Sequence, residues 1–398
     1  MSINEKMLAL GSKRSIIREI FEYSKIRAAE IGKENVFDFS LGNPSVCPPE
    51  EVSKTIISLV QGENPTSLHG YTSAQGDANT RKVIADGINK RFAAGVSADN
   101  IYMTCGAAAS LTISLKAILN RGEEVVVFAP FFTEYRVFVE NADGVLIISR
   151  PEEKTFQIDL EDFESKISEK TRAVIINSPN NPSGVVYTEE KLKAVSDILR
   201  KKSVEYGNPI YMIADEPYRV LVYDDIKVPY LMNYYDNCLV CYSYSKALSL
   251  PGERIGYIAV NPKAENSKEL YAAVCGAGRS LGYVCAPSLF QKVIAKCADC
   301  ECDIKAYKEN RDLLFNALTS FGYECVKPDG AFYLFVKALE QDAYKFFERA
   351  KSHELLVVPC DDFGVKGYVR IAYCVDKKTI ENALPEFEKL KREYDENK

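Results

Sequence analysis

Three apolar runs in the middle of the sequence are each followed by a polar cluster whose side chains could do chemistry. The runs and clusters are RAVIIN with SPNNPSG, PIYMIA with DEPYR, and CYSYS with KALSLPGERIGY. They contribute an amide, a carboxylate and an amine, from Asn181, Asp215 and Lys246. A lysine near a carboxylate and hydrogen-bond donors suits a Schiff base with an aldehyde cofactor, whose protonated ring nitrogen the carboxylate would hold. Each cluster taken alone is also typical of a turn, a strand end or a solvated lysine.

A fourth cluster, Gly106-Ala107-Ala108, opens a helical segment after the short apolar run IYMT. Because these side chains are small, the backbone N–H groups at the start of the helix stay accessible, which suits a bound phosphate. The chain holds no G-x-G-x-x-G pattern, so a nicotinamide cofactor loses its strongest support. These residues therefore favour an aldehyde cofactor that carries a phosphate.

The elements that must position these clusters alternate between strand and helix from about residue 100 to about residue 260. Apolar runs, among them EEVVVFAP, VLIIS and RIGYIAVNP, are separated by helical segments, and Thr188 is a candidate N-cap for one of them. Such a pattern indicates a mostly parallel sheet covered by helices on both faces, which binds ligands beyond the carboxyl ends of its strands. The polar clusters stand at those ends.

A smaller α/β unit is expected after about residue 300, where the pattern becomes a helix, two strands (GYECVK and AFYLFV), a helix, a strand and a helix. A length of 398 residues is typical of two domains. We predict an N-terminal arm that is part of the small domain, a large cofactor-binding domain and a small C-terminal domain, over residues 1–35, 36–295 and 296–398.

Composition limits the classes of function. Apolar residues make up 46 % and charged residues 27 % of the chain, and the net charge of −6 argues against a nucleic-acid or anionic-membrane partner. The only histidines are His69 and His353, so a Ser-His-Asp hydrolase and a histidine-rich metal site are poor fits. We recognise no signal peptide and no transmembrane run, and we expect a cytoplasmic protein with reduced cysteines.

Two cysteine pairs have the spacing of zinc ligands: Cys238 with Cys241, and Cys297 with Cys300, with Cys302 beside the second pair. Cys238 and Cys241 lie in a strand-like run, where residues three apart point to opposite faces, so both cannot easily bind one ion. We therefore predict no metal site.

Together, the motifs SLGNP, NNPSG, DEPYR and SYSKALSLPGERIGY resemble those of the class I pyridoxal-phosphate-dependent aminotransferases of fold type I, the aspartate aminotransferase-like enzymes. The resemblance runs from Ser40 to Arg370 in the family's order. It implies a large domain with a mostly parallel sheet of seven-stranded type between helices, plus a smaller α/β domain. It also implies a homodimer that uses pyridoxal 5′-phosphate to move an amino group between an L-amino acid and a 2-keto acid, which we expect to be 2-oxoglutarate.

The resemblance also implies roles for individual residues. Lys246 matches the lysine that forms the internal aldimine and moves the proton, Asp215 matches the partner of the ring nitrogen, and Tyr218 and Asn181 match the groups at the phenolic oxygen. Arg370, with Asn181, matches the residues that bind the substrate α-carboxylate. Gly42 and Asn43 match a segment that closes over that carboxylate. The residues matching the phosphate site are Gly106, Ala107, Ala108, Ser243, Ser245, Arg254 and, from the neighbouring subunit, Tyr71.

The sequence departs from the family's pattern at three places. Many relatives have tryptophan at the ring-stacking position, whereas this chain has no tryptophan, and we align Phe132, after Phe131, with that position. Ala107 and Ala108 stand where relatives often have a hydroxyl residue or glycine, so one side-chain contact to the phosphate is in doubt. Arg279 is a candidate for selecting acidic side chains, and a surface arginine explains it equally well.

Two other functions stay open at this point. A C–S β-lyase on the same fold would share Lys246, Asp215 and Arg254, and a product assay with a thioether amino acid would separate it from an aminotransferase. A non-catalytic cofactor-sensing domain would carry a winged helix-turn-helix, but only about 35 residues precede SLGNP. The preferred amino donor cannot be read from these motifs.

Overall fold

The computed structural model describes residues 3–12 and 15–396, which form two compact units. The main segment of the larger unit runs from residue 46 to residue 304, whereas the large domain was predicted to run from residue 36 to residue 295. The larger unit consists of Val46–Ile304 and Asp329–Ala331, and the smaller unit of Met1–Ser45, Lys305–Pro328 and Phe332–Lys398.

A seven-stranded sheet forms the centre of the larger unit, in the order β2-β8-β7-β6-β5-β3-β4. Its strands from β7 to β4 are parallel, and β8 is antiparallel to both of its neighbours. The predicted mostly parallel sheet is therefore confirmed. The strands are β2 (Ile101–Thr104), β3 (Glu124–Phe128), β4 (Val145–Ser149), β5 (Thr171–Asn177), β6 (Tyr211–Asp215), β7 (Cys238–Ser243) and β8 (Gly256–Val260).

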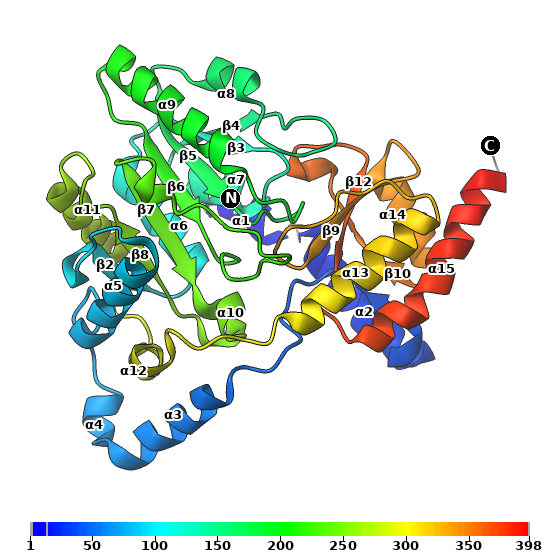
Figure 1. The fold of residues 1–398 in the computed structure, drawn as a ribbon, viewed down its shortest axis with the longest axis horizontal. Helices are drawn as coiled ribbons and strands as arrows, with labels where there is room; N and C mark the ends of the chain where they lie inside the picture. Colours follow the sequence, from blue (N-terminus) through cyan, green and yellow to red (C-terminus); the bar gives the residue numbers. More distant parts are fainter. Residues whose placement is uncertain (1–2, 13–14, 397–398) are drawn as a thin grey trace. The chain divides into compact units, whose positions relative to one another are not determined.

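Helices cover both faces of this sheet (Figure 1). The α-helices of the larger unit are α3 (Glu50–Gly62), α4 (Pro65–Leu68), α5 (Ala78–Phe92), α6 (Ala107–Ile118), α7 (Glu134–Asn141), α8 (Leu160–Lys166), α9 (Glu189–Tyr206), α10 (Tyr244–Ala247), α11 (Ser267–Ser280) and α12 (Ser288–Cys297). Helix α6 packs on β7 and β8 and contacts α7 and α11, while α8 packs on α9. Short 3-10 turns complete the unit: η2 (Ala98–Asn100), η3 (Leu231–Asn233) and η4 (Pro251–Glu253).

Burial on both sides explains why the central strands appear in the sequence as continuous apolar runs. Every residue of β7 is buried, and so is every residue of β6 after Tyr211. Helix α9 begins at Thr188, whose side chain accepts a hydrogen bond of 3.2 Å from the Lys191 N–H, and it ends at Gly207, with φ of 66°. The predicted N-cap is therefore confirmed.

Strands β5, β6 and β7 end side by side. Asn177 at the end of β5 is in register with Asp215 at the end of β6, and Asp215 is in register with Cys241 of β7. Because the carboxyl ends of parallel strands lie at one edge of a sheet, the three polar clusters start from the same edge.

The smaller unit contains an antiparallel sheet in the order β11-β12-β9 and a parallel pair formed by β1 and β10. Helix α2 ends at Gly32, as the sequence predicts. The strands are β1 (Phe37–Asp38), β9 (Tyr333–Lys337), β10 (Leu355–Leu356), β11 (Val358–Pro359) and β12 (Tyr368–Ala372). The helices are α1 (Glu5–Ser12), α2 (Ile16–Ile31), α13 (Lys305–Ser320), α14 (Ala343–Ser352) and α15 (Lys377–Glu396), with 3-10 turns η1 (Lys33–Asn35) and η5 (Asp361–Phe363).

The predicted strand GYECVK is wrong. Only Cys325 of this segment pairs with β9, in an isolated bridge to Val336. Gly322 at φ 92° begins the segment and Pro328, which has no N–H, follows it, so there is little room for a ladder. The segment is an irregular connection between α13 and β9.

Among the helices that the structure describes, none has both the length and the apolar character needed to cross a membrane. Within residues 3–12 and 15–396, no group of three or more His, Cys, Asp or Glu side chains is arranged to hold a metal ion.

Candidate active site

Asp215 is the last residue of β6 and is almost completely buried, with 5 % of its surface exposed. Its Oδ2 atom accepts a hydrogen bond of 2.5 Å from the Tyr135 hydroxyl, and its Oδ1 atom has no hydrogen-bond partner among the described residues. Burial raises the pKa of the Asp215 carboxyl to about 7, and the nearby Glu216 adds to the rise, whereas the hydrogen bond from Tyr135 opposes it.

Tyr135 is a site residue that the sequence analysis missed. It lies on α7, is fully buried, and burial together with the charge of Asp215 raises the pKa of its hydroxyl well above the usual value, so the hydroxyl stays a hydrogen-bond donor. Its ring meets that of Phe132 edge to face, with centroids 5.8 Å apart. Tyr135 lies in the segment FFTEYRVF, close to Phe132. Nothing in the sequence spacing connects it with Asp215, which is 80 residues further along the chain.

The Asp215 carboxyl fits the ring nitrogen of pyridoxal 5′-phosphate. A buried carboxyl oxygen without a partner is costly unless a donor reaches it. A protonated pyridine nitrogen is such a donor, and its positive charge would favour the ionised form of Asp215. The residues present therefore suit this cofactor at this position.

Apart from Tyr71, the residues predicted for the phosphate lie together at the start of α6. Gly106 has φ of 89°, and a Cβ atom there would lie 3.0 Å from Arg254 Nη2. Arg254 Nη1 donates to Ser245 Oγ at 3.4 Å, and the Ser243 and Ser245 hydroxyls are 2.8 Å apart. A guanidinium, two hydroxyls and the first N–H groups of a helix make a typical phosphate site.

A second glycine, Gly256, lets strand β8 lie close to Gly106. Gly256, at the start of β8, has no Cβ, and one placed there would lie 2.3 Å from the Tyr242 carbonyl oxygen and 3.0 Å from Gly106 Cα. Of the two alanines in the turn, Ala107 is the first residue of α6 and half-buried, and Ala108 is exposed.

The remaining predicted residues of the larger unit follow the same strand ends. Lys246 lies on the short helix α10, whose N-cap Ser243 accepts a hydrogen bond from the Ser245 N–H at 3.2 Å. The Asn181 N–H donates to Asn177 Oδ1 at 2.7 Å, which ties the NNPSG turn to the end of β5. Tyr218 is buried, with 6 % of its surface exposed.

In the smaller unit, Arg370 and Gly42 both lie against Tyr333, a residue that was not predicted for the site. Arg370 on β12 is buried, its Nη2 donates to the Ser40 carbonyl oxygen at 2.6 Å, and its guanidinium lies 4.5 Å from the centre of the Tyr333 ring. A Cβ atom on Gly42 would lie 2.0 Å from the Tyr333 hydroxyl oxygen. The SLGNP segment is therefore packed closely against Tyr333, which also supports Arg370.

Three other predicted residues show no such grouping. Tyr71 follows α4 and is 99 % exposed. Arg279, in the last turn of α11, is exposed and makes no ion pair with the described carboxylates. Asn43 is exposed, and its side-chain amide lies 3.5 Å from the carbonyl oxygen of Pro44.

Comparison with known proteins gives consistent matches along the chain. A family model described as "Aminotransferase class I and II" matches residues 34–387. The "Probable aspartate aminotransferase" of Methanocaldococcus jannaschii is 30 % identical over 383 residues, which is 94 % of this chain and 96 % of that protein.

Two solved structures are similar to this fold. The crystal structure of an amino transferase from Eubacterium rectale is 57 % identical, with a TM-score of 0.97 and 99 % of both chains covered. The aspartate aminotransferase of Thermotoga maritima is 28 % identical, with a TM-score of 0.86, covering 97 % of this chain and 99 % of the other.

Proposed function

This chain belongs to the class I and II aminotransferase family and is a transaminase, and from that premise we propose which of its residues perform the reaction. The observation that carries the proposal is the buried Asp215 carboxyl with one oxygen bonded to Tyr135 and the other without a partner among the described residues. Pyridoxal 5′-phosphate, which the family uses, supplies an aldehyde that combines with amines and a ring that withdraws electrons from the substrate.

Four groups of residues would hold the cofactor. Asp215 would keep a proton on the ring nitrogen, while Tyr135 holds the carboxyl in place through its other oxygen. Tyr218 and Asn181 would donate hydrogen bonds to the phenolic oxygen, and Phe132 would pack on the ring. The phosphate is bound by the start of α6, from Gly106 to Ala108, and by the side chains of Ser243, Ser245 and Arg254.

Lys246 performs the proton transfer. Its amine would hold the cofactor aldehyde and, with a substrate bound, would take the proton from the substrate Cα. The chain has only two histidines, and neither lies in the clusters that follow β5, β6 and β7, so a lysine is the base that this site offers.

Arg370 binds the α-carboxylate of the substrate. Its guanidinium has a hydrogen bond to Ser40 and a cation–π contact with Tyr333, which orient the fork before a substrate arrives. Gly42 and Asn43, in the segment that passes Tyr333, would close over the same carboxylate.

We expect Gly42→Ala to raise the KM for amino-acid substrates about tenfold or more, because a Cβ 2.0 Å from the Tyr333 hydroxyl must displace either that ring or the segment. The absorption of the bound cofactor should stay unchanged. The matched control is Gly62→Ala at the end of α3, where a Cβ meets nothing within 4 Å. An unchanged KM in Gly42→Ala would contradict this role for the segment.

The acceptor that we propose is 2-oxoglutarate, and the donor panel should begin with aspartate because similar proteins carry that name. The test is a product balance: each donor consumed should give one 2-keto acid and one glutamate. Release of ammonia and a thiol from a thioether amino acid without any acceptor would instead support the C–S β-lyase.

We also propose a homodimer. Tyr71 has almost no contact within its own chain, which is expected if its hydroxyl reaches the phosphate in a second subunit. Sedimentation of the cofactor-loaded enzyme measures the assembly directly, and a monomer with full activity would contradict it.

A further inference from the structure

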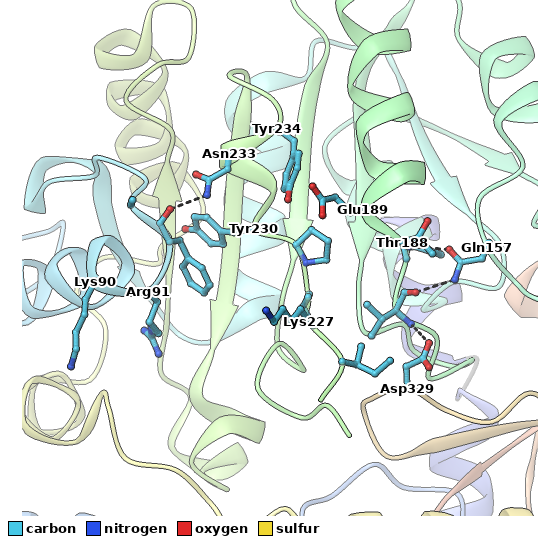
Figure 2. A pocket seen from close by; sticks show the side chains of 17 residues that line it. Lys90, Arg91, Gln157, Thr188, Glu189, Lys227, Tyr230, Asn233, Tyr234 and Asp329 are labelled. Carbon is cyan, nitrogen blue, oxygen red and sulfur yellow. Dashed lines mark hydrogen bonds between the residues drawn. The ribbon is translucent and has the colours of Figure 1, made fainter. Parts of the chain in front are cut away.

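A cavity of about 790 Å³ lies in the larger unit, between the end of α5, the loop 226–230, η3 and the start of α9 (Figure 2). This volume is within the range of small-molecule sites. The residues that line it include none of those proposed above for the cofactor or the substrate. The cavity is therefore a separate feature of the unit.

Three positive side chains are among the residues that line the cavity. Lys227 and Arg91 line it and have no carboxylate within 4.0 Å in the part of the chain that the structure describes. Lys90 stands beside them and has one distant partner, Asp299, at 4.0 Å. In Figure 2 the Lys227 amine points toward the side on which Arg91 lies. Cations that face a hollow without counter-ions attract anions.

The two acidic side chains in the lining, Glu189 and Asp329, have partners of their own. Glu189 pairs with Lys193 at 2.5 Å, one turn along α9. Asp329 Oδ2 accepts a hydrogen bond of 3.1 Å from the Val186 N–H. The lining therefore has three cations, Lys90, Arg91 and Lys227, against two carboxylates, one of which is paired with Lys193 outside the lining, although the whole chain has a net charge of −6.

A buried ion pair fixes the part of the wall that follows Lys227 in the sequence. Arg219, 8 % exposed, donates two hydrogen bonds to the carboxylate of Glu216, which is 3 % exposed. The same guanidinium donates to the carbonyl oxygens of Val228, at 2.9 Å, and Pro229, at 2.8 Å. Both carbonyls belong to residues that line the cavity.

Aromatic rings complete this wall. Phe92 and Tyr230 are stacked with centroids 4.2 Å apart, and the Arg219 guanidinium lies 5.1 Å from each ring centre. Asn233 Nδ2 donates to the Phe92 carbonyl oxygen at 2.8 Å. A wall held by so many contacts is ordered before any ligand binds, which lowers the entropic cost of binding.

We propose that this cavity binds a small organic oxyanion, a phosphate monoester or a carboxylate. Its charged oxygens lie between Lys227 and Arg91, and its apolar part lies against Val228, Pro229 and Tyr230. Lys227 and Arg91 favour a negative charge, and Val228, Pro229 and Tyr230 favour an apolar part.

The test measures binding to the cofactor-loaded enzyme by calorimetry at low ionic strength, with phenyl phosphate, benzoate and inorganic phosphate as probes. Phenyl phosphate or benzoate should bind saturably, and Lys227→Gln and Arg91→Gln should each weaken the tighter of the two about tenfold. Inorganic phosphate should bind at least about tenfold more weakly than phenyl phosphate, because it lacks the apolar part. The probe that binds more tightly identifies the oxyanion.

The matched control is Lys268→Gln, an exposed lysine of α11 outside the cavity, which removes the same charge and should leave binding unchanged. Lys227→Gln should also leave transamination without a probe unchanged. The proposal is overturned if neither organic probe binds, if the control weakens binding as much as the two cavity variants, or if inorganic phosphate binds as tightly as phenyl phosphate. Binding that neither cavity variant affects would place the probe elsewhere.

Discussion

Lys246→Ala should lower the rate of transamination by about 10³-fold or more, the largest effect we expect from any single change. The substitution removes the amine that anchors the cofactor and the base that moves the Cα proton, so two contributions are lost together. The measurement is the rate of keto-acid formation from the best donor, at saturating donor and acceptor.

A second readout separates this assignment from a general loss of structure. Borohydride reduction of the wild-type enzyme should attach the cofactor covalently to the peptide that contains Lys246, and the alanine variant should give no adduct. Lys263→Ala is a suitable control, because Lys263 is exposed in the turn after β8. An adduct on a different lysine peptide would show that another residue has this role.

Asp215→Asn should have opposite effects on the two forms of the protein. With cofactor, most of the activity should be lost, because a neutral amide cannot keep the ring nitrogen protonated. Without cofactor, the variant should be more stable than the wild type above pH 7, because it no longer buries a carboxylate. Retention of nearly full turnover would contradict the proposed electron-withdrawing role.

In the cofactor-free protein, the raised Asp215 pKa determines whether folding stability rises or falls with pH. The Asp215 pKa is about 7 in the folded chain, against 3.8 as its ordinary value. Between these values the folded protein holds a proton that the unfolded chain has released, so stability falls as pH rises from about 4 to about 7. The asparagine variant lacks this loss, which is bounded by about 4 kcal/mol. Thermal unfolding at pH 5 and pH 8 should show the difference growing with pH.

Tyr135→Phe is the companion to this experiment. Loss of the hydroxyl removes the one hydrogen bond that lowers the Asp215 pKa, so the decline in stability of the cofactor-free protein should extend to higher pH. No such change is expected in Tyr187→Phe, a buried tyrosine for whose raised pKa burial is the one cause.

The larger unit was predictable because its strands are long and buried on both faces. Such strands form uninterrupted apolar runs, and the helices between them have recognisable ends, such as Thr188 and Gly207. In the smaller unit, β10 and β11 have two residues each, too few for a pattern to emerge. GYECVK alternates in a strand-like way, yet only Cys325 pairs.

The proposed site was predictable where a motif lies at a strand end, as with Asp215 and Lys246. It was not predictable where a role depends on a contact between distant segments. Tyr135 on helix α7 reaches Asp215 at the end of strand β6, and Tyr333 supports Arg370 from the neighbouring strand β9. One tyrosine among 24 has no local feature that distinguishes it, so only the fold reveals these two.

The contact between Gly106 and Gly256 restricts how this enzyme can change under mutation and selection. A side chain on Gly106 would meet Arg254, and one on Gly256 would meet both the Tyr242 carbonyl and Gly106 itself. Neither substitution can be compensated at the other position, because both already lack a side chain. A library that randomises these two codons would consist almost entirely of defective members. Directed evolution toward a new amino donor should therefore keep this pair constant and vary residues that contact only the substrate.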